Sequence, residues 1–168
     1  MRNMAKRMPI PKGLDRDKVK GSSEWEALYQ AYSAIFKVQE IALNPQGISL
    51  PQLQMLSLLA RERRPLTIGE LARWMVKEPN SLTGLVDRAE AKGWVTTHGD
   101  RNDRRKRLVE FTRAGVRKYE ETFAVSTRVG EKLFGKLSSA EMSQLKSACE
   151  KLRAAAVAEL KSRPALRG

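Results

Sequence analysis

Two short helices with clear start and stop signals follow one another near the middle of the chain, and their spacing constrains the fold more than any other feature. Thr67 and Glu70 stand three residues apart, as in a capping box, where each side chain accepts a hydrogen bond from the other's backbone N–H. Pro79 comes twelve residues after Thr67 and suits the first turn of a second helix. Gly93 ends that second helix. Two short helices joined by a tight turn predict a helix-turn-helix, although many helical hairpins share this spacing.

The segments after the second helix favour strands. Residues 94–97 and 108–112 are rich in β-branched and aromatic residues and are expected to pair as a two-stranded hairpin. The loop between them, residues 98–107, carries five basic and two acidic residues. Most charge runs are solvated polar turns, but arginine is the side chain best suited to phosphates and narrow minor grooves. A basic hairpin directly after a helix-turn-helix therefore favours a DNA-binding wing.

Long amphipathic helices flank this region. Apolar residues recur at three- and four-residue spacing over residues 23–44, from Val116 onwards, and after a capping box at Ser138 and Glu141. Their apolar stripes are wider than two small lobes can cover, which predicts burial against a second copy in a two-fold homodimer. The expected fold class is mostly α with a small two-stranded β wing, a winged helix-turn-helix plus a helical dimerisation region.

Charge and capping signals divide the expected fold into parts. The N-terminal residues are basic and interrupted by proline and glycine, as in a flexible arm. Another capping box, at Ser49 and Gln52, opens the central lobe. The expected parts are a basic arm (residues 1–22), a DNA-binding lobe (residues 49–115) and a helical dimerisation region (residues 23–48 and 116–168).

The charge balance points to a polyanionic partner. The chain has 32 Lys and Arg against 19 Asp and Glu, a formal net charge of +13, which suits nucleic acid or an acidic membrane face. The basic clusters fall in an arm and a loop rather than on one face of an amphipathic helix, which argues against a membrane partner. No run approaches the roughly 18 consecutive apolar residues of a membrane span. The N-terminus has no apolar signal region, so a cytoplasmic protein is expected.

Residues that would support catalysis or metal binding do not occur in their usual patterns. The only histidine, His98, has no Cys or acidic partner at metal-ligand spacing. The only cysteine, Cys149, falls on the apolar face of the last helix, where a thiol behaves as a small hydrophobe rather than a redox sensor. Phosphate-binding, dinucleotide-binding and serine-nucleophile motifs do not occur. We therefore expect no enzyme activity, no metal site and no cofactor.

Three stretches together resemble the MarR family of bacterial transcription regulators. They are residues 85–95, the wing pattern Asp-x-x-Asp-Arg-Arg at residues 100–105, and residues 109–115, in which Thr112 and Gly115 match the family's strand-to-helix signature. The resemblance implies a homodimer whose two winged-helix lobes bind double-stranded DNA at a near-palindromic operator. It also implies a ligand-responsive transcription regulator, usually a repressor.

The same resemblance implies that the second helix enters the major groove. The residues expected at or near the bases are Asn80, Ser81, Thr83, Gly84 and Arg88. Arg88 has the alternative of contacting a phosphate, or its neighbour Asp87, from the flank of the helix. Gly84 stands where many relatives have a longer polar or basic side chain. Either the backbone approaches the base edges there, or specificity depends on the wing and on DNA shape, and we favour the second interpretation.

The wing carries the second set of expected DNA contacts. They are Arg101, Asn102, Arg104, Arg105 and Lys106, with Asp100 and Asp103 as supports of the loop. One of Arg104 and Arg105 is expected to contact DNA while the other pairs with an aspartate, and the sequence does not assign which. Candidate phosphate contacts are Arg73, Lys77 and Arg113, for which ordinary surface charge is the equal alternative.

Aromatic residues offer a candidate effector pocket. In relatives, effectors bind between the dimer helices and the DNA-binding lobe, so a small aromatic or phenolic effector is expected here. The candidate lining residues are Trp25, Tyr29, Tyr32, Phe36, Trp74 and Tyr119. Two alternatives stay open: these aromatics form core without a pocket, or the protein is a constitutive DNA-binding or architectural protein with no effector.

Overall fold

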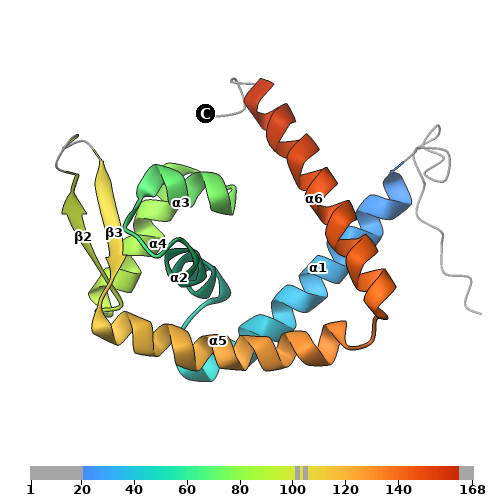
Figure 1. The fold of residues 1–168 in the computed structure, drawn as a ribbon, viewed down its shortest axis with the longest axis horizontal. Helices are drawn as coiled ribbons and strands as arrows, with labels where there is room; N and C mark the ends of the chain where they lie inside the picture. The colour runs from blue at the N-terminus through green and yellow to red at the C-terminus, as the bar shows by residue number, and fades with distance from the viewer. Residues whose placement is uncertain (1–20, 101–102, 104–105, 163–168) are drawn as a thin grey trace, which may run out of the picture. The chain divides into compact units, whose positions relative to one another are not determined.

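Six α-helices and a small antiparallel sheet make up the described part of the computed structural model, which covers residues 21–100, 103 and 106–162. The chain divides into two compact units, residues 1–36 and 37–168. The elements are α1 (Ser22–Leu43), η2 (Asn44–Gln46), α2 (Leu50–Glu62), β1 (Leu66–Thr67), α3 (Ile68–Met75), α4 (Pro79–Ala91), β2 (Val95–Gly99), β3 (Arg107–Phe111), α5 (Arg113–Phe134) and α6 (Ser139–Ser162). Figure 1 shows α2, α3 and α4 grouped beside the β2–β3 hairpin, with α5 passing the base of the hairpin.

Capping boxes start three of the helices, as predicted. They pair Ser49 with Gln52, Thr67 with Glu70 and Ser138 with Glu141. In the box of α3, the Thr67 N–H donates to Glu70 Oε2 at 2.7 Å, and the Glu70 N–H donates to Thr67 Oγ1 at 3.1 Å. Each box satisfies backbone donors that a helix start otherwise leaves without a partner. These local bonds therefore set where the helices begin.

One apolar core holds the helix-turn-helix and the sheet together. Its fully buried side chains come from α2, α3, α4 and both hairpin strands, and they include Met55, Leu56, Leu71, Leu82, Val86, Val95 and Val109. The helix α4 contributes Leu82, Leu85, Val86 and Ala89, which lie on one side of the helix at three- and four-residue spacing. Burial of that side leaves the opposite, polar side of α4 at the surface.

The sheet contains a strand that the sequence analysis did not predict. Its order is β1-β3-β2, with β2 and β3 paired as the predicted hairpin and β1 added through Leu66 opposite Val109 and Thr67 opposite Leu108. The two-residue β1 carries no alternating pattern, so periodicity does not reveal it. The hairpin ladder also extends to Gly99 and Arg107, which the sequence analysis assigned to the loop.

The start of α5 lies directly against the end of α4. Thr112 caps α5 by accepting a hydrogen bond from the Gly115 N–H at 2.9 Å, and its hydroxyl donates to the Gly93 carbonyl at 2.6 Å. A Cβ atom added to Gly115 would lie 1.7 Å from the Trp94 carbonyl oxygen. Only glycine therefore permits this approach of α5 to the turn that follows α4.

Replacing Gly115 with alanine is expected to lower the free energy of unfolding by about 2–3 kcal/mol, because the new methyl group must push α5 away from Trp94. Urea denaturation followed by circular dichroism measures the change. Gly130→Ala is the matched control in the same helix, since nothing lies within 4 Å of an added Cβ there. That control is expected to gain up to about 1 kcal/mol from helix propensity. Equal effects at the two positions would contradict the steric explanation.

Candidate nucleic-acid interface

The helix α4 presents its polar side to solvent. Of the residues predicted to face the major groove, Asn80, Ser81 and Arg88 are exposed, and Thr83 and Gly84 are half-buried. The Thr83 hydroxyl donates to the Pro79 carbonyl at 3.1 Å, so its oxygen keeps lone pairs for an outside donor. An amide, two hydroxyls and a guanidinium along one helix side offer donors and acceptors that suit base edges and phosphates. Their contacts with DNA stay predictions.

Nothing inside the lobe requires glycine at position 84. A Cβ atom added there would meet only the Arg88 Nη1 atom, at an ordinary van der Waals distance of 3.4 Å. A glycine inside a helix normally costs about 1 kcal/mol relative to alanine. The reason for Gly84 therefore lies outside the packing of this lobe.

Gly84→Ala is expected to raise the free energy of unfolding by about 1 kcal/mol and to leave the affinities for an operator and for a random duplex unchanged. Fluorescence anisotropy with labelled duplexes measures both affinities. A selective loss of operator affinity would show instead that the bases approach the backbone at Gly84, which is the interpretation that we do not favour.

The turn at the tip of the hairpin is closed by backbone hydrogen bonds. The Asp100 N–H donates to the Lys106 carbonyl at 2.9 Å, and the Lys106 N–H donates to the Asp103 carbonyl at 2.8 Å. The Asp103 N–H also donates to Asp100 Oδ1 at 3.2 Å, and Lys106 Nζ lies 3.5 Å from Asp103 Oδ2. Both predicted supports thus lie in this turn. The other predicted wing contacts, Arg101, Asn102, Arg104 and Arg105, lie outside the described residues.

A charged network that the sequence analysis missed joins the hairpin to α4. Arg107 Nη1 lies 2.7 Å from Asp87 Oδ1, and Arg107 Nη2 lies 2.7 Å from Glu90 Oε2. The other oxygen of Glu90 accepts from the Thr97 N–H at 2.7 Å and from the Thr97 hydroxyl at 2.8 Å. The Thr97 hydrogen bonds, with Arg107, lower the pKa of Glu90, and the bond to Asp87 raises the pKa of Arg107. Arg107 is therefore the first residue of β3 and is paired with two carboxylates. The sequence analysis had counted it in the loop.

A second ion pair lies at the start of α3. Arg64 Nη2 lies 2.7 Å from Glu70 Oε1, while the other oxygen of Glu70 holds the cap at Thr67. Arg64, with the Thr67 hydrogen bonds, lowers the pKa of Glu70 to about 2. One carboxylate thus joins the end of α2 to the start of α3.

Because the pKa of Glu70 is lower in the folded protein, its stabilising effect is present above about pH 4.5 and is lost as the pH falls towards 2. We expect Glu70→Gln to be less stable than the parent by about 1 kcal/mol at pH 6, after allowance for the exposure of Arg64. The difference should vanish near pH 2, because glutamine still closes a capping box, as Gln52 does in α2. Urea denaturation across this pH range tests it. An equal loss of stability at pH 6 and near pH 2 would show that the substitution acts through packing rather than through the charge of Glu70.

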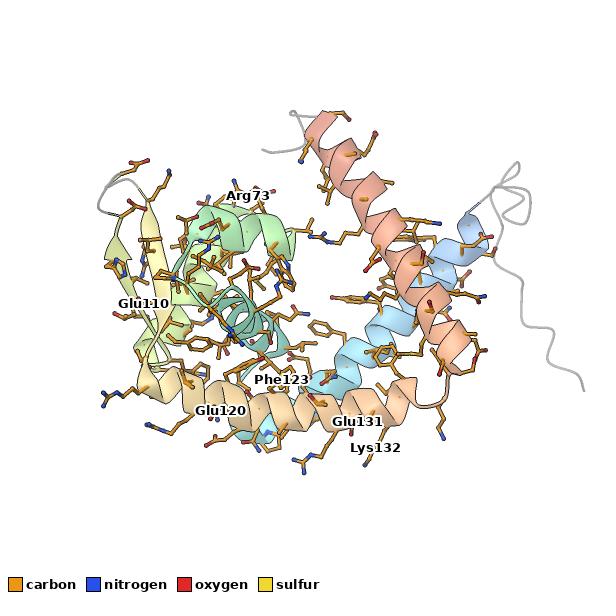
Figure 2. All side chains as sticks on the ribbon, in the orientation of Figure 1. Arg73, Glu110, Glu120, Phe123, Glu131 and Lys132 are labelled. Carbon is orange, nitrogen blue, oxygen red and sulfur yellow. The ribbon has the colours of Figure 1, made fainter. Side chains whose placement is uncertain are left out.

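The candidate phosphate contacts are exposed on separate elements. Arg73 lies on α3 (Figure 2), Lys77 lies in the turn between α3 and α4, and Arg113 is the first residue of α5. Within the described residues none of the three forms an ion pair with an acidic side chain. Their positive charges are available to an outside anion.

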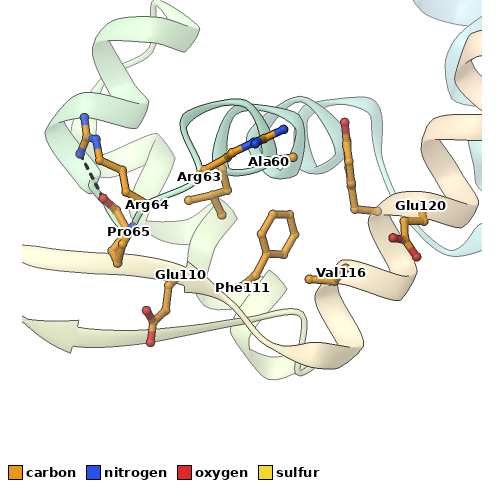
Figure 3. Close-up of a pocket in the computed structure, with 10 residues that line it drawn as sticks. Ala60, Arg63, Arg64, Pro65, Glu110, Phe111, Val116 and Glu120 are labelled. Atoms are coloured by element: carbon orange, nitrogen blue, oxygen red, sulfur yellow. Dashed lines mark hydrogen bonds between the residues drawn. The ribbon is translucent and has the colours of Figure 1, made fainter.

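A cavity of about 490 Å³ opens between the end of α2, β3 and the start of α5 (Figure 3). Its lining residues are Leu59, Ala60, Arg63, Arg64, Pro65, Glu110, Phe111, Val116, Tyr119 and Glu120. The rings of Phe111 and Tyr119 lie 6.0 Å apart. Arg63 ends α2 with a φ of 53°, a conformation that costs energy for a side chain with a Cβ. The cavity thus combines apolar and aromatic walls with charged side chains of both signs, Arg63, Glu110 and Glu120, while the Arg64 guanidinium is paired with Glu70.

The structure does not gather all six predicted effector residues in this cavity. Tyr119 lines it, whereas Trp74 lines a separate hollow of about 290 Å³ and lies under the Arg61 guanidinium, 5.0 Å from the ring centroid. The four α1 aromatics, Trp25, Tyr29, Tyr32 and Phe36, belong to the unit of residues 1–36. There they pair along the helix, with centroid distances of 6.5 Å for Trp25–Tyr29 and 5.7 Å for Tyr32–Phe36.

Neither His98 nor Cys149 joins a cluster of metal-ligating side chains. His98 Nε2 lies 3.6 Å from Glu110 Oε1 across the hairpin, and Cys149 is exposed on α6. In residues 21–100, 103 and 106–162, no three His, Cys, Asp or Glu side chains are grouped to hold a metal ion. No helix of that same part is long and apolar enough to cross a membrane.

Comparison with known proteins agrees with this geometry. A family model described as MarR family matches residues 46–106. The transcriptional activatory protein BadR of Rhodopseudomonas palustris is 34% identical over 95 residues, which cover 55% of this chain and 54% of BadR. The HTH-type transcriptional repressor NicR of Pseudomonas putida is 31% identical over 114 residues, which cover 67% of this chain and 69% of NicR. The chain thus spans about half the length of BadR and about two thirds of NicR.

Solved structures share the fold. A mutant MarR from E. coli, complexed with operator DNA, matches with a TM-score of 0.71 and 23% identity over 77% of this chain and 93% of that one. BpsR of Bordetella bronchiseptica, whose DNA binding is regulated by 6-hydroxynicotinic acid, matches with a TM-score of 0.73 and 20% identity over 80% of this chain and 96% of BpsR. At these identities the likeness establishes a winged helix-turn-helix fold.

Proposed function

Because the chain belongs to the MarR family of DNA-binding transcription regulators, which are not enzymes, we propose that it is a homodimeric, ligand-responsive repressor acting at a near-palindromic operator in the cytoplasm. The observation that carries this proposal is the polar side of α4, which stands exposed beside a hairpin with a basic tip. In a winged helix such a helix enters the major groove while the hairpin reaches a neighbouring groove. NicR, the relative with the greater coverage, is named a repressor.

Unpartnered apolar side chains support the homodimer. In α1, Trp25 is 67% exposed and Tyr29 and Tyr32 are each 59% exposed. No described residue of α6 is buried, although Leu152 and Leu160 repeat along it. A helix that buries nothing in its own chain gains its stability by packing against another. A second copy related by two-fold symmetry covers equivalent surfaces on both chains and places two recognition helices about 34 Å apart, one turn of DNA.

The cavity beside α5 supports an effector of the aromatic-acid class. Phe111 and Tyr119 offer ring faces, and Arg63 offers donors for a carboxylate, since the Arg64 guanidinium is paired with Glu70. BpsR, which shares the fold, is regulated by 6-hydroxynicotinic acid, an aromatic acid. A ligand changes DNA binding only if it binds one lobe arrangement more tightly than another. A cavity shared by α2, β3 and α5 meets this condition, because α5 leads directly from the wing.

Footprinting on the DNA upstream of the protein's own gene, with and without aromatic acids, tests the proposal. We expect a discrete, near-palindromic footprint that an aromatic acid releases, and lower transcription from that promoter when the protein is bound. Affinity should fall about tenfold or more for every few phosphate contacts as salt rises from about 50 to about 200 mM. Coating without sequence preference would support the architectural alternative, and higher transcription would overturn the repressor assignment.

A cavity variant shows where the effector binds. Val116→Trp narrows the cavity with a bulky ring and is expected to keep the footprint while losing its release by the acid. Ala124→Trp is the matched control, because it adds the same ring to an exposed position of α5 outside the cavity lining. Release that persists in Val116→Trp would place the effector elsewhere.

A further inference from the structure

The wing is joined to the rest of the lobe at its base, along the β1–β3 pairing, and through a charged network at its outer end. At its base, the Thr112 hydroxyl bonds to the Gly93 carbonyl, and Gly115 lets α5 lie against Trp94. The network at the outer end is centred on Arg107, the first residue of β3, which lies five residues before Thr112, roughly 16 Å away at the usual strand rise. The pairing with β1 holds β3 beside the start of α3. The bonds of Arg107 add a direct link from the outer end of the hairpin to α4.

We propose that Arg107 is a positioning residue for DNA binding, which fixes the wing against the recognition helix so that both enter the DNA as one rigid body. The inference rests on the proposed function, in which α4 and the wing bind adjacent grooves. It goes beyond that function because it assigns an effect on DNA affinity to a residue whose guanidinium is paired with two carboxylates of its own chain. DNA binding by two elements is stronger when their spacing is set beforehand, since less freedom is lost on binding.

The geometry of the network suits this role. Asp87 and Glu90 stand three residues apart and so share one side of α4, where the two arms of the Arg107 guanidinium reach them at 2.7 Å each. Glu90 also accepts two hydrogen bonds from Thr97 on β2. The network therefore holds both strands of the wing to the same turn of α4. A lysine at position 107 has no fork and cannot span both carboxylates in this way.

The charges of the network separate this role from a direct phosphate contact. Asp87 and Glu90 place two negative charges on the helix proposed to enter the DNA, and Arg107 faces them. If Arg107 contacted phosphate directly, removing Glu90 would leave more positive charge near the DNA and raise the affinity. If Arg107 acts by holding the wing, removing Glu90 lowers the affinity instead. The two roles predict opposite signs for the same substitution.

Operator affinity of the full chain tests the inference, measured by fluorescence anisotropy over a salt series for Arg107→Gln, Glu90→Ala and the double variant. Each single variant is expected to bind about tenfold more weakly, and the double variant to bind no more than about threefold more weakly than either single, because the two residues act as one unit. The slope of log affinity against log salt should stay at the parent value, whereas a lost phosphate contact reduces it by about one. Arg107→Lys should show an intermediate loss.

Glu78→Ala is the matched control, because Glu78 precedes α4, is exposed and makes no capping hydrogen bond with its side chain. Its removal is expected to leave the affinity equal to the parent's or to raise it. Tighter binding by Glu90→Ala, losses that multiply in the double variant, or a slope reduced by one in Arg107→Gln would each overturn the positioning role. If the parent protein itself shows no preference for an operator, the proposed function fails, which is a separate result.

Discussion

The backbone of Trp94 comes so close to α5 that only glycine fits between them, and the placement of the DNA-binding elements depends on this contact. Trp94 follows α4 and precedes β2, so its position fixes the end of the recognition helix and the start of the wing together. Trp94 is 9% exposed, and its ring lies under the ammonium groups of Lys92, at 4.6 Å, and Lys118, at 5.8 Å. These cation–π contacts add the lysine that follows α4 and a lysine of α5 to the same junction. A shift of α5 at Gly115 therefore displaces both DNA-binding elements.

This junction gives the proposed effector a physical route to the DNA. Val116 and Tyr119 line the cavity and follow Gly115 within about one turn of α5. Phe111, the last residue of β3, also lines the cavity. A ligand between these side chains changes the packing at the same place where α5 meets Trp94. Packed interfaces between helices tend to switch between discrete arrangements rather than to deform continuously. The cavity and the wing base thus lie on one element, α5, and a ligand that binds one arrangement of α5 more tightly would act on the wing through it.

The sequence predicts the parts of this fold that short-range chemistry determines. The capping boxes at Ser49, Thr67 and Ser138 need only the residue three positions on, and the Gly93 N–H and the Thr112 hydroxyl likewise bond to backbone groups three residues away. Contacts between distant segments leave no such pattern. The strand β1 is defined by its partner in β3, and Arg107 by carboxylates seventeen and twenty residues away. The turn between α3 and α4 uses Val76 at a φ of 51°, which a β-branched residue rarely adopts, so the surrounding packing determines it.

The candidate site shows the same limit in its charges. A net charge of +13 counts every basic residue equally, but counterion release depends only on those that neutralise phosphates. Arg61, Arg64 and Arg107 each lie within 2.9 Å of a carboxylate oxygen in their own chain. Arg107 in particular was counted among the basic residues of the loop, but it belongs to the network that links the wing to α4. The steepness of salt dependence therefore measures how many basic side chains remain available to the DNA, and it is expected to be smaller than the composition alone suggests.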